Sequence, residues 1–435
     1  MKHLKQNIAI VYLLCASLVM AQQTPAPKQT KPIAIMGATA HIGNGEIIEN
    51  SVLIFKAGKL TTVAEASVVK IDISNMEVIN AAGKHVYPGF IIPNSTLGLV
   101  EIDAVRASDD DAEIGHLNPH IRSLIAYNAE SKIIETIRPN GVLLGQITPR
   151  GGRISGTSSI VQFDAWNWED AAIKVDDGVH VNWPNSFARG RWWKGEAPGL
   201  KPNENYTKQV QEVTHFIKQS QAYLNGDKPI KHLPFEAVRG LFDGSKKLYV
   251  HVNDAKAITD AVNFKNEYGI KNMVVVGGEQ ALQVASLLKH NNVPVLIRRV
   301  HSLPKHTDDA YDQPFKLAKV LTDAGLLVAL ENSGDMERMH ARNLPFLAGT
   351  TVAYGLSKEQ ALQLITLNAA KILGIDQTYG SLEVGKSATL FISEGDALDM
   401  RTNMLERAFV DGRDISLESH QTNLWKRYSN KYKNQ

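Results

Sequence analysis

Short, almost wholly apolar segments alternate with amphipathic segments from Val86 to Ile372, and this alternation constrains the fold more than any other feature of the chain. Strands that are apolar on both faces are typical of a parallel sheet covered by helices. Many such units in succession favour a closed (β/α)8 barrel over an open sheet. The predicted strands are residues 86–91, 142–148, 248–252, 273–276, 294–298 and 326–330, and the predicted helices are residues 128–137, 255–268, 280–290, 315–324 and 358–372.

The segments on either side of this region have a different texture. Residues 33–81 and 380–415 carry short apolar runs separated by glycine-containing turns, which is typical of β-hairpins. We therefore predict an α/β fold, a TIM barrel with a small composite β-sandwich domain made from both ends of the chain. The predicted boundaries are a linker at 22–32, the β-domain at 33–85 and 376–415, the barrel at 86–375 and a polar tail at 416–435. Residues 180–245 fit the repeat poorly and are predicted to be an excursion over the barrel mouth.

The first residues have the pattern of a secretory signal peptide. Lys2 and Lys5 precede an apolar run from Ile8 to Met20, and Ala21 gives a small residue before a polar break. The run is short for a bilayer span of about 20 residues. We expect cleavage after Ala21, and therefore a periplasmic or secreted protein.

Cleavage at that point changes the composition of the 435-residue chain. It removes two of the 47 basic residues and the single cysteine, and leaves 414 residues with 45 basic and 45 acidic side chains. Such a balance argues against a nucleic-acid partner or an anionic membrane partner. Without cysteine the mature chain has no disulfide, no thiolate nucleophile and no cysteine-ligated metal.

Four motifs in order carry a resemblance to a known family. They are the opening hairpins from Gly37 to Lys59, the segment from Ala82 to Ile91 with Pro88-Gly89-Phe90-Ile91, the helix from Thr366 to Ile375, and Gly380 to Lys386. Together these motifs resemble the amidohydrolase superfamily, and most closely its imidazolonepropionase-like branch. The resemblance implies hydrolysis of C–N bonds in cyclic amides, ureas and similar compounds. It also implies one or two divalent metals at the C-terminal mouth of the barrel, where the metal activates a water.

The positions that match the family's metal ligands are mostly substituted. Asn94 and Thr96 stand where the family has two histidines, Gly277 and Gly278 where it has the histidine of strand six, and Ser333 where it has the aspartate of strand eight. The histidine of strand five is retained as His251. Neutral oxygens are poor replacements for imidazole on zinc. We therefore expect no binuclear centre, and at most one divalent metal such as zinc, held through His251.

The strand-eight position leaves room for a substitute, and the bridging ligand of the family has one weak candidate. Glu331 or Asp335 would replace the strand-eight aspartate if the loop shifts, and Lys174 is a weak candidate for a bridging carboxylated lysine.

Other residues at predicted strand ends are candidates for the chemistry, since barrel enzymes place their catalytic groups there. The candidate catalytic residues are His251, His180, His301 and Glu331. The three histidines either form a cluster that holds one metal or acts as a base, or are loop histidines bonded to backbone. The candidate substrate-binding residues are Asn94, Thr96, Arg150, Asn253 and Ser333.

Arg150 is a candidate because it begins a glycine-containing loop. Arg150-Gly151-Gly152-Arg153 could bind a carboxylate or phosphate, or could be a tight βα-loop with solvated arginines.

Two functions follow from the sequence and stay open at this point. The first is an exported hydrolase that acts on a C–N bond of a small molecule with an altered metal site. The second is a catalytically inactive binding or partner subunit, either a homo-oligomer or paired with an active relative. Fold resemblance supports both equally, because fold does not fix function.

Overall fold

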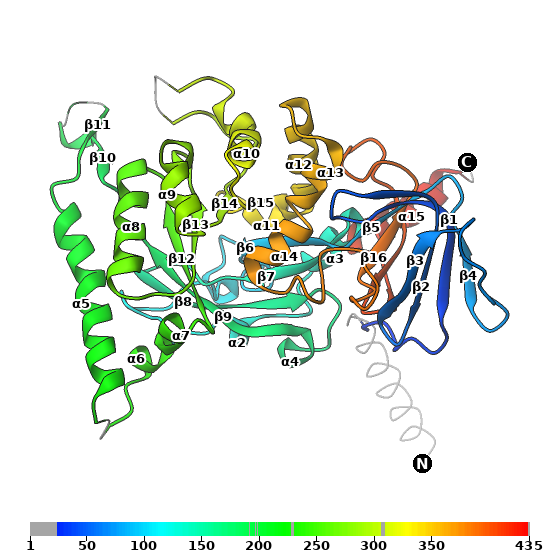
Figure 1. The fold of residues 1–435 in the computed structure, drawn as a ribbon, viewed down its shortest axis with the longest axis horizontal. Helices are drawn as coiled ribbons and strands as arrows, with labels where there is room; N and C mark the ends of the chain where they lie inside the picture. The colour runs from blue at the N-terminus through cyan, green and yellow to red at the C-terminus, as the bar shows by residue number, and fades with distance from the viewer. Residues whose placement is uncertain are drawn as a thin grey trace, which may run out of the picture.

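The computed structural model describes residues 24–190, 192–195, 197, 199–227, 230–305 and 309–433. The predicted signal peptide, with its cleavage site at Ala21, lies outside the described residues. The described chain forms two large sheets, and helices lie along one of them (Figure 1).

The sheet of the chain ends combines strands from both termini. Its order is β18-β17-β16-β5-β1-β2-β3, with β4 paired to β1. Strand β5 joins the two halves, because it pairs parallel with β1 and antiparallel with β16. Phe55 and Phe409 meet edge to face in its core, 5.1 Å between ring centroids. The strands are β1 (Ile33–His41), β2 (Ile47–Lys56), β3 (Lys59–Glu65), β4 (Glu77–Asn80), β5 (His85–Pro88), β16 (Leu390–Ser393), β17 (Leu405–Val410) and β18 (Arg413–Ile415).

The barrel sheet runs β15-β14-β13-β12-β9-β8-β7-β6. Every pair is parallel except β7–β8 and β8–β9, so only β8 among these strands runs in the reverse direction. The predicted pattern of strand and helix fails here because the connections on both sides of β8 are too short for a crossover helix. The strands are β6 (Phe90–Ser95), β7 (Val142–Ile147), β8 (Ile154–Gln162), β9 (Ala172–Asn182), β12 (Lys247–Val252), β13 (Met273–Gly277), β14 (Val295–Ile297) and β15 (Val328–Leu330).

The gap between the outer strands of this sheet is bridged by one short segment. The Ile91 N–H of β6 donates to the Ile365 carbonyl at 2.8 Å, and the Leu330 N–H of β15 donates to the Leu364 carbonyl at 3.1 Å. Two consecutive carbonyls thus satisfy edge donors of both strands. The sheet is a nearly closed barrel, completed by these two residues.

The helices mostly confirm the predicted positions, although their bounds differ. The predicted helix at 358–372 is two helices, and the one at 128–137 is a single turn at Ile134–Ile137. Helix α8 starts at an Asp254 cap whose carboxylate accepts from the Ala257 N–H at 2.8 Å. The main helices are α3 (Ile134–Ile137), α5 (Tyr206–Asn225), α8 (Ala255–Glu267), α9 (Ala285–His290), α10 (Gln313–Asp323), α11 (Glu337–His340), α12 (Leu344–Ala353), α13 (Lys358–Gln363), α14 (Leu367–Leu373) and α15 (His420–Lys433).

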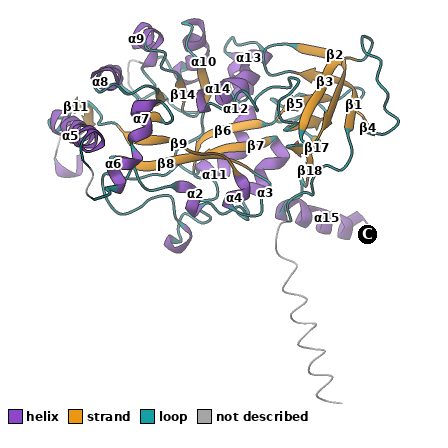
Figure 2. Cartoon of the chain, turned by 60° about the horizontal axis from the view of Figure 1, so that its bottom comes forward, coloured by secondary structure: helices purple, strands orange, loops and turns teal. Residues whose placement is uncertain are grey.

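The remaining short helices are α2 (Ser123–Ala126), α4 (Trp168–Ala171), α6 (Leu233–Ala237) and α7 (Arg239–Asp243). Figure 2 shows α5, α8 and α9 at the end of the molecule away from the sheet of the chain ends.

The segment that fits the repeat poorly contains a small hairpin, β10 (Phe187–Arg189) with β11 (Leu200–Pro202), followed by α5. Phe187 and Leu200 of this hairpin line the same cavity as Asn253, which follows β12. The hairpin therefore lies at the mouth of the barrel. Within the described residues, no helix combines the length and the apolar character needed to cross a bilayer.

Candidate functional site

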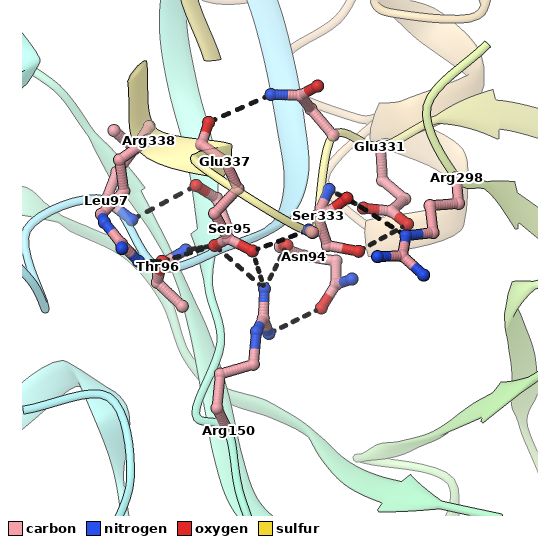
Figure 3. Close-up of polar contacts among 12 residues, drawn as sticks. Asn94, Ser95, Thr96, Leu97, Arg150, Arg298, Glu331, Ser333, Glu337 and Arg338 are labelled. Atoms are coloured by element: carbon pink, nitrogen blue, oxygen red, sulfur yellow. Dashed lines mark hydrogen bonds and ion pairs between the residues drawn. The ribbon is translucent and has the colours of Figure 1, made fainter. Parts of the chain in front are cut away.

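Asn94 and Thr96, which the resemblance puts where the family has paired histidines, lie at the end of β6 and are buried. Asn94 has a left-handed backbone, with φ of 52°. Its side-chain oxygen accepts from Arg150 Nη1 at 3.0 Å, and its carbonyl accepts from Arg150 Nη2 at 2.9 Å (Figure 3). The guanidinium of Arg150 is thus fixed against the end of the first barrel strand.

Glu337, at the start of α11, completes this group. Both of its carboxylate oxygens lie 3.2 Å from Arg150 Nη2, and Oε1 accepts from the Thr96 N–H at 2.9 Å and from the Thr96 hydroxyl. Arg338 Nη1 donates to the Thr96 hydroxyl at 2.8 Å. We call Asn94, Thr96, Arg150, Glu337 and Arg338 the arginine–glutamate cluster (Figure 3). Arg150, predicted to bind substrate, therefore has its guanidinium committed to partners within the protein.

Sequence reasoning missed Glu337 and Arg338. They lie four and five residues beyond Ser333, the position that matches the family's aspartate. The Gly334 N–H donates to Glu337 Oε2 at 3.3 Å, so a turn after the strand brings this carboxylate back to the barrel end. The one sequence feature that could have pointed to them is the adjacent pair of opposite charges, Glu337-Arg338, shortly after Gly334.

Two of the three candidate histidines do meet. His180 Nδ1 and His251 Nε2 are 3.0 Å apart, and His180 Nε2 lies 2.9 Å from the Ser158 hydroxyl. The Ser158 hydroxyl donates to buried Asp177 at 2.7 Å, which also accepts from the Tyr249 hydroxyl at 2.8 Å. Since Ser158 donates to the carboxylate, it accepts from His180. His180 Nδ1 in turn accepts from the Nε2–H of His251. The Nδ1 of His251 is then unprotonated and can accept a hydrogen bond.

Both of these histidines are held neutral. Burial, with the positive charges of Arg150 and Arg298 nearby, lowers the pKa of His251 to about 3. Burial and the neighbouring His251 lower the pKa of His180 well below its ordinary value.

His301 does not join the pair. Its Nε2 lies 2.7 Å from the Thr350 hydroxyl of α12, and its ring packs 5.9 Å from that of Phe315. The arrangement in which His180 and His301 both turn toward His251 is therefore wrong for His301. The reason is that His301 lies in the loop after β14, where α10 and α12 supply its contacts.

The donor set does not fit the family's metal centre. Among the described residues, no group of three or more His, Cys, Asp or Glu side chains is arranged to hold a metal ion. At Gly277 an added Cβ would lie 2.3 Å from the side-chain oxygen of Asn253, so a histidine at this position would displace Asn253. A guanidinium, held beside Asn94, adds positive charge where a cation would have to bind. The residues at this end of the barrel therefore do not fit the metal that the resemblance implies.

Lys174 is not a bridging lysine. It lies near the start of β9, at the opposite end of the barrel from the mouth, where its ammonium donates to the Leu373 carbonyl at 3.0 Å. This carbonyl is in the last turn of α14, so Lys174 caps a helix C-terminus.

Glu331 and Ser333 form a second polar pair just after β15. The Ser333 hydroxyl donates to Glu331 Oε1 at 2.9 Å, and the Ser333 N–H donates to Oε2. Arg298 Nε donates to the Ser333 carbonyl at 3.2 Å (Figure 3). Burial raises the pKa of Glu331 to about 7, against the opposing effect of the hydrogen bonds from Ser333. A carboxyl with this pKa can take up or release a proton near neutral pH.

Cavities open at the same barrel end. One of about 250 Å³ lies between the loops after β14 and β15, and Ser333 and Arg298 line it. A second of about 600 Å³ extends toward the β10–β11 hairpin and also includes Arg298 and Asn253. Since Glu279, Arg298 and Lys305 line both, the two cavities meet at these residues. Of the predicted substrate-binding residues, Asn253 and Ser333 line a cavity, whereas Asn94 and Thr96 are buried in the cluster.

Comparison with known proteins agrees with the resemblance. Residues 240–417 match the amidohydrolase family. An imidazolonepropionase from Flavobacterium psychrophilum is 29% identical over 109 residues, which span 23% of this chain and 26% of that protein. An imidazolonepropionase from Syntrophobacter fumaroxidans is 37% identical over 79 residues, 18% of this chain and 19% of that protein. The chain thus matches about a quarter or less of the length of these relatives.

Solved structures match over most of the chain. An amidohydrolase from Thermotoga maritima MSB8 has a TM-score of 0.75 at 22% identity, and covers 88% of this chain and 99% of its own. A putative prolidase from Bifidobacterium longum has a TM-score of 0.53 at 16% identity, over 92% of this chain and 99% of its own. These likenesses show the fold. The amidohydrolase family match covers residues 240–417, and imidazolonepropionases are among the relatives that the chain resembles.

Proposed function

We propose that the protein is an exported hydrolase that acts on a C–N bond, other than a peptide bond, in a small cyclic amide or similar compound. The observation that carries the proposal is the Glu331–Ser333 pair. Glu331 directly follows β15, where barrel enzymes carry catalytic groups. The Ser333 hydroxyl connects its buried carboxylate to the cavity. Kinship to imidazolonepropionases supports the choice of a ring amide.

The chemistry needs a group that accepts a proton from water. Glu331 is buried, so a water in the cavity would pass its proton to the Ser333 hydroxyl as that hydroxyl passes its own to Glu331 Oε1. The resulting hydroxide adds to the amide carbon. Glu331 then returns the proton by the same route to the leaving nitrogen as the C–N bond breaks. A pKa of about 7 suits both halves of this exchange.

The arginine–glutamate cluster favours a second function, a non-catalytic binding or partner subunit. Its guanidinium and carboxylate are bonded to each other and to the residues that replace the paired histidines. A site filled in this way needs no metal for its structure. This subunit would bind a small molecule and either associate with itself or pair with an active relative.

Two measurements on the purified protein separate these functions. Elemental analysis is expected to find no binuclear centre, and a panel of cyclic amides, cyclic ureas and N-acyl amino acids is tested for ring opening or release of amine. If the protein is a hydrolase, Glu331→Gln should lower kcat by about 10²- to 10⁴-fold. Two stoichiometric metals per chain would contradict the altered site, and no turnover of any panel member would favour the binding subunit.

Export is the part of the proposal that rests on the N-terminal sequence. Mass spectrometry of protein recovered from an expressing cell should find a mature N-terminus at Gln22. A protein that retains Met1 would contradict export by this route.

A further inference from the structure

The 250 Å³ cavity contains two arginines that have no carboxylate partner among the described residues. Arg298 is exposed, and its one hydrogen bond to a described residue goes from Nε to the Ser333 carbonyl. Arg299 donates from Nη2 to the carbonyls of Asn332, at 3.3 Å, and Asp335, at 2.9 Å. The Arg299 Nε is buried and has no acceptor in the described part of the chain. Both guanidiniums therefore keep hydrogen-bonding capacity unused by the protein.

The net charge of the lining defines what this cavity would accept. Three basic side chains line it, Arg298, Arg299 and Lys305, against two acidic ones, Glu279 and Asp335. Lys305 is already paired, because its Nζ lies 2.5 Å from Glu279 Oε1. Burial lowers the pKa of His301, so its ring adds no charge at neutral pH. One net positive charge remains, which balances a monoanion and not a dianion.

The other walls of the cavity are apolar. Leu303, Pro314 and Leu317 line the side toward α10. A volume of about 250 Å³ is smaller than the roughly 300–1,000 Å³ of common ligand pockets. The occupant is therefore small, with an apolar part beside its charge. Ser333 lines the same cavity, so a ligand whose charge lies on the arginines brings its remaining atoms toward the Glu331–Ser333 pair.

We propose that this cavity binds the carboxylate of a small, partly apolar monocarboxylate, held by the guanidiniums of Arg298 and Arg299. A planar carboxylate accepts two parallel N–H bonds from a guanidinium. If the protein is the hydrolase proposed above, its substrate is an amide that also carries a carboxylate. This part of the inference rests on the proposed function. The binding itself does not require turnover.

Titration calorimetry with a matched ligand pair tests the proposal. N-acetyl-leucine carries the charge, and N-acetyl-leucinamide has the same shape without it. We expect the carboxylate to bind the full mature chain at least 10-fold more tightly than the amide. Phenyl phosphate, a dianion at pH 8, should bind more weakly than the carboxylate. Equal affinity for the first two ligands, or a preference for phenyl phosphate, would overturn the proposal.

Variants locate the contact. Arg298→Ala and Arg299→Ala should each weaken N-acetyl-leucine binding at least 10-fold and leave N-acetyl-leucinamide binding unchanged. Arg298→Lys, which keeps the charge but loses the fork, should fall between. Arg342→Ala is the matched control, because Arg342 is exposed and lines none of these cavities. Full affinity in both alanine variants would sink the proposal.

The two proposals can fail separately. Charge-dependent binding without turnover of any panel member would refute the hydrolase and leave the carboxylate site in place. Turnover with a KM that Arg298→Ala and Arg299→Ala do not change would refute the site and leave the hydrolase in place.

Discussion

Arg150 and Arg298 lie at the same end of the barrel, but their surroundings differ. Arg150 is bonded to Asn94 and Glu337, which leaves little of its guanidinium for a ligand. Within the described part of the chain Arg298 makes one hydrogen bond, to a backbone carbonyl, and it lines two cavities. The first arrangement stabilises the fold where the family places its metal ligands. The second leaves charge available to a ligand. Residue type alone does not separate the two, since partners decide what an arginine does.

The largest expected effect comes from removing the carboxylate that pairs with Arg150. Glu337→Ala would leave Arg150 without its carboxylate in a mostly buried place, and we expect a loss of about 3–5 kcal/mol in the free energy of unfolding. Urea denaturation measures it. Glu279→Ala is the comparison from the cavity that Arg298 lines. The Glu279–Lys305 pair there is more exposed and should contribute less than about 1 kcal/mol. Similar losses of unfolding free energy in both variants would contradict the distinction between the surroundings of Arg150 and those of Arg298.

The next effect concerns Glu331 and the pH dependence of stability. Its pKa rises from an ordinary 4.5 to about 7 in the fold, so the folded protein binds this proton more tightly than the unfolded chain. The stabilisation is complete below pH 4.5 and is lost as pH rises to 7, on the order of 3 kcal/mol. Glu331→Gln should remove this part of the pH profile, measured by urea unfolding at pH 5, 6, 7 and 8. An unchanged slope would refute the assignment.

The histidine pair gives an effect of opposite sign. His251 is neutral in the fold, with a pKa near 3, but titrates near 6.5 when unfolded. Its contribution is therefore complete above pH 6.5 and is lost as pH falls toward 3. Between pH 6.5 and 5 this amounts to about 2 kcal/mol. His251→Gln should reduce the loss, and exposed His290→Gln, on α9, serves as control. Equal acid sensitivity of wild type and His251→Gln would contradict the buried neutral state.

The smallest effect is at the far end of the barrel. Lys174→Met removes one hydrogen bond to the last turn of α14 and should cost about 0.3–1 kcal/mol, with metal content and ligand binding unchanged. Thermal unfolding measures the loss of stability, and elemental analysis measures the metal content. A change in metal content would restore Lys174 as a ligand of the site.

Much of the fold could be predicted from the sequence, because apolar runs and turn residues are local signals. Five of the six predicted barrel strands coincide with strands of the barrel sheet, and the two β-rich ends share one sheet. The predicted strand at 86–91 is instead divided between β5 of the sheet of the chain ends and β6 of the barrel. Residues 154–178, which hold β8 and most of β9, were not predicted to be strands. There β8 and β9 pair antiparallel along a hairpin that contains buried Ser158 and Asp177, so the apolar pattern is interrupted by polar residues that bond to each other inside the barrel.

The site was less predictable, because its contacts join distant segments. Pro88-Gly89-Phe90-Ile91 predicted the first barrel strand and placed Asn94 and Thr96 at its end, where the structure has them buried. Their partner Glu337 is 241 residues from Thr96, and no local pattern links them. The contact between His180 and His251 could be predicted, because both lie at strand ends on the same edge of the sheet. The position of His301 could not, because its loop is held by a contact with α12.

The bridge at Leu364 and Ile365 has a consequence for synthesis and for the design of shorter chains. The carbonyls that satisfy both edges of the barrel sheet come late in the chain, and β16 pairs with β5 later still. A ribosome-bound chain that stops before residue 364 exposes unpaired edges on two strands, which is a template for aggregation. Expression fragments that end within residues 330–364 should therefore precipitate, and the native state becomes accessible only when nearly the whole polypeptide has emerged.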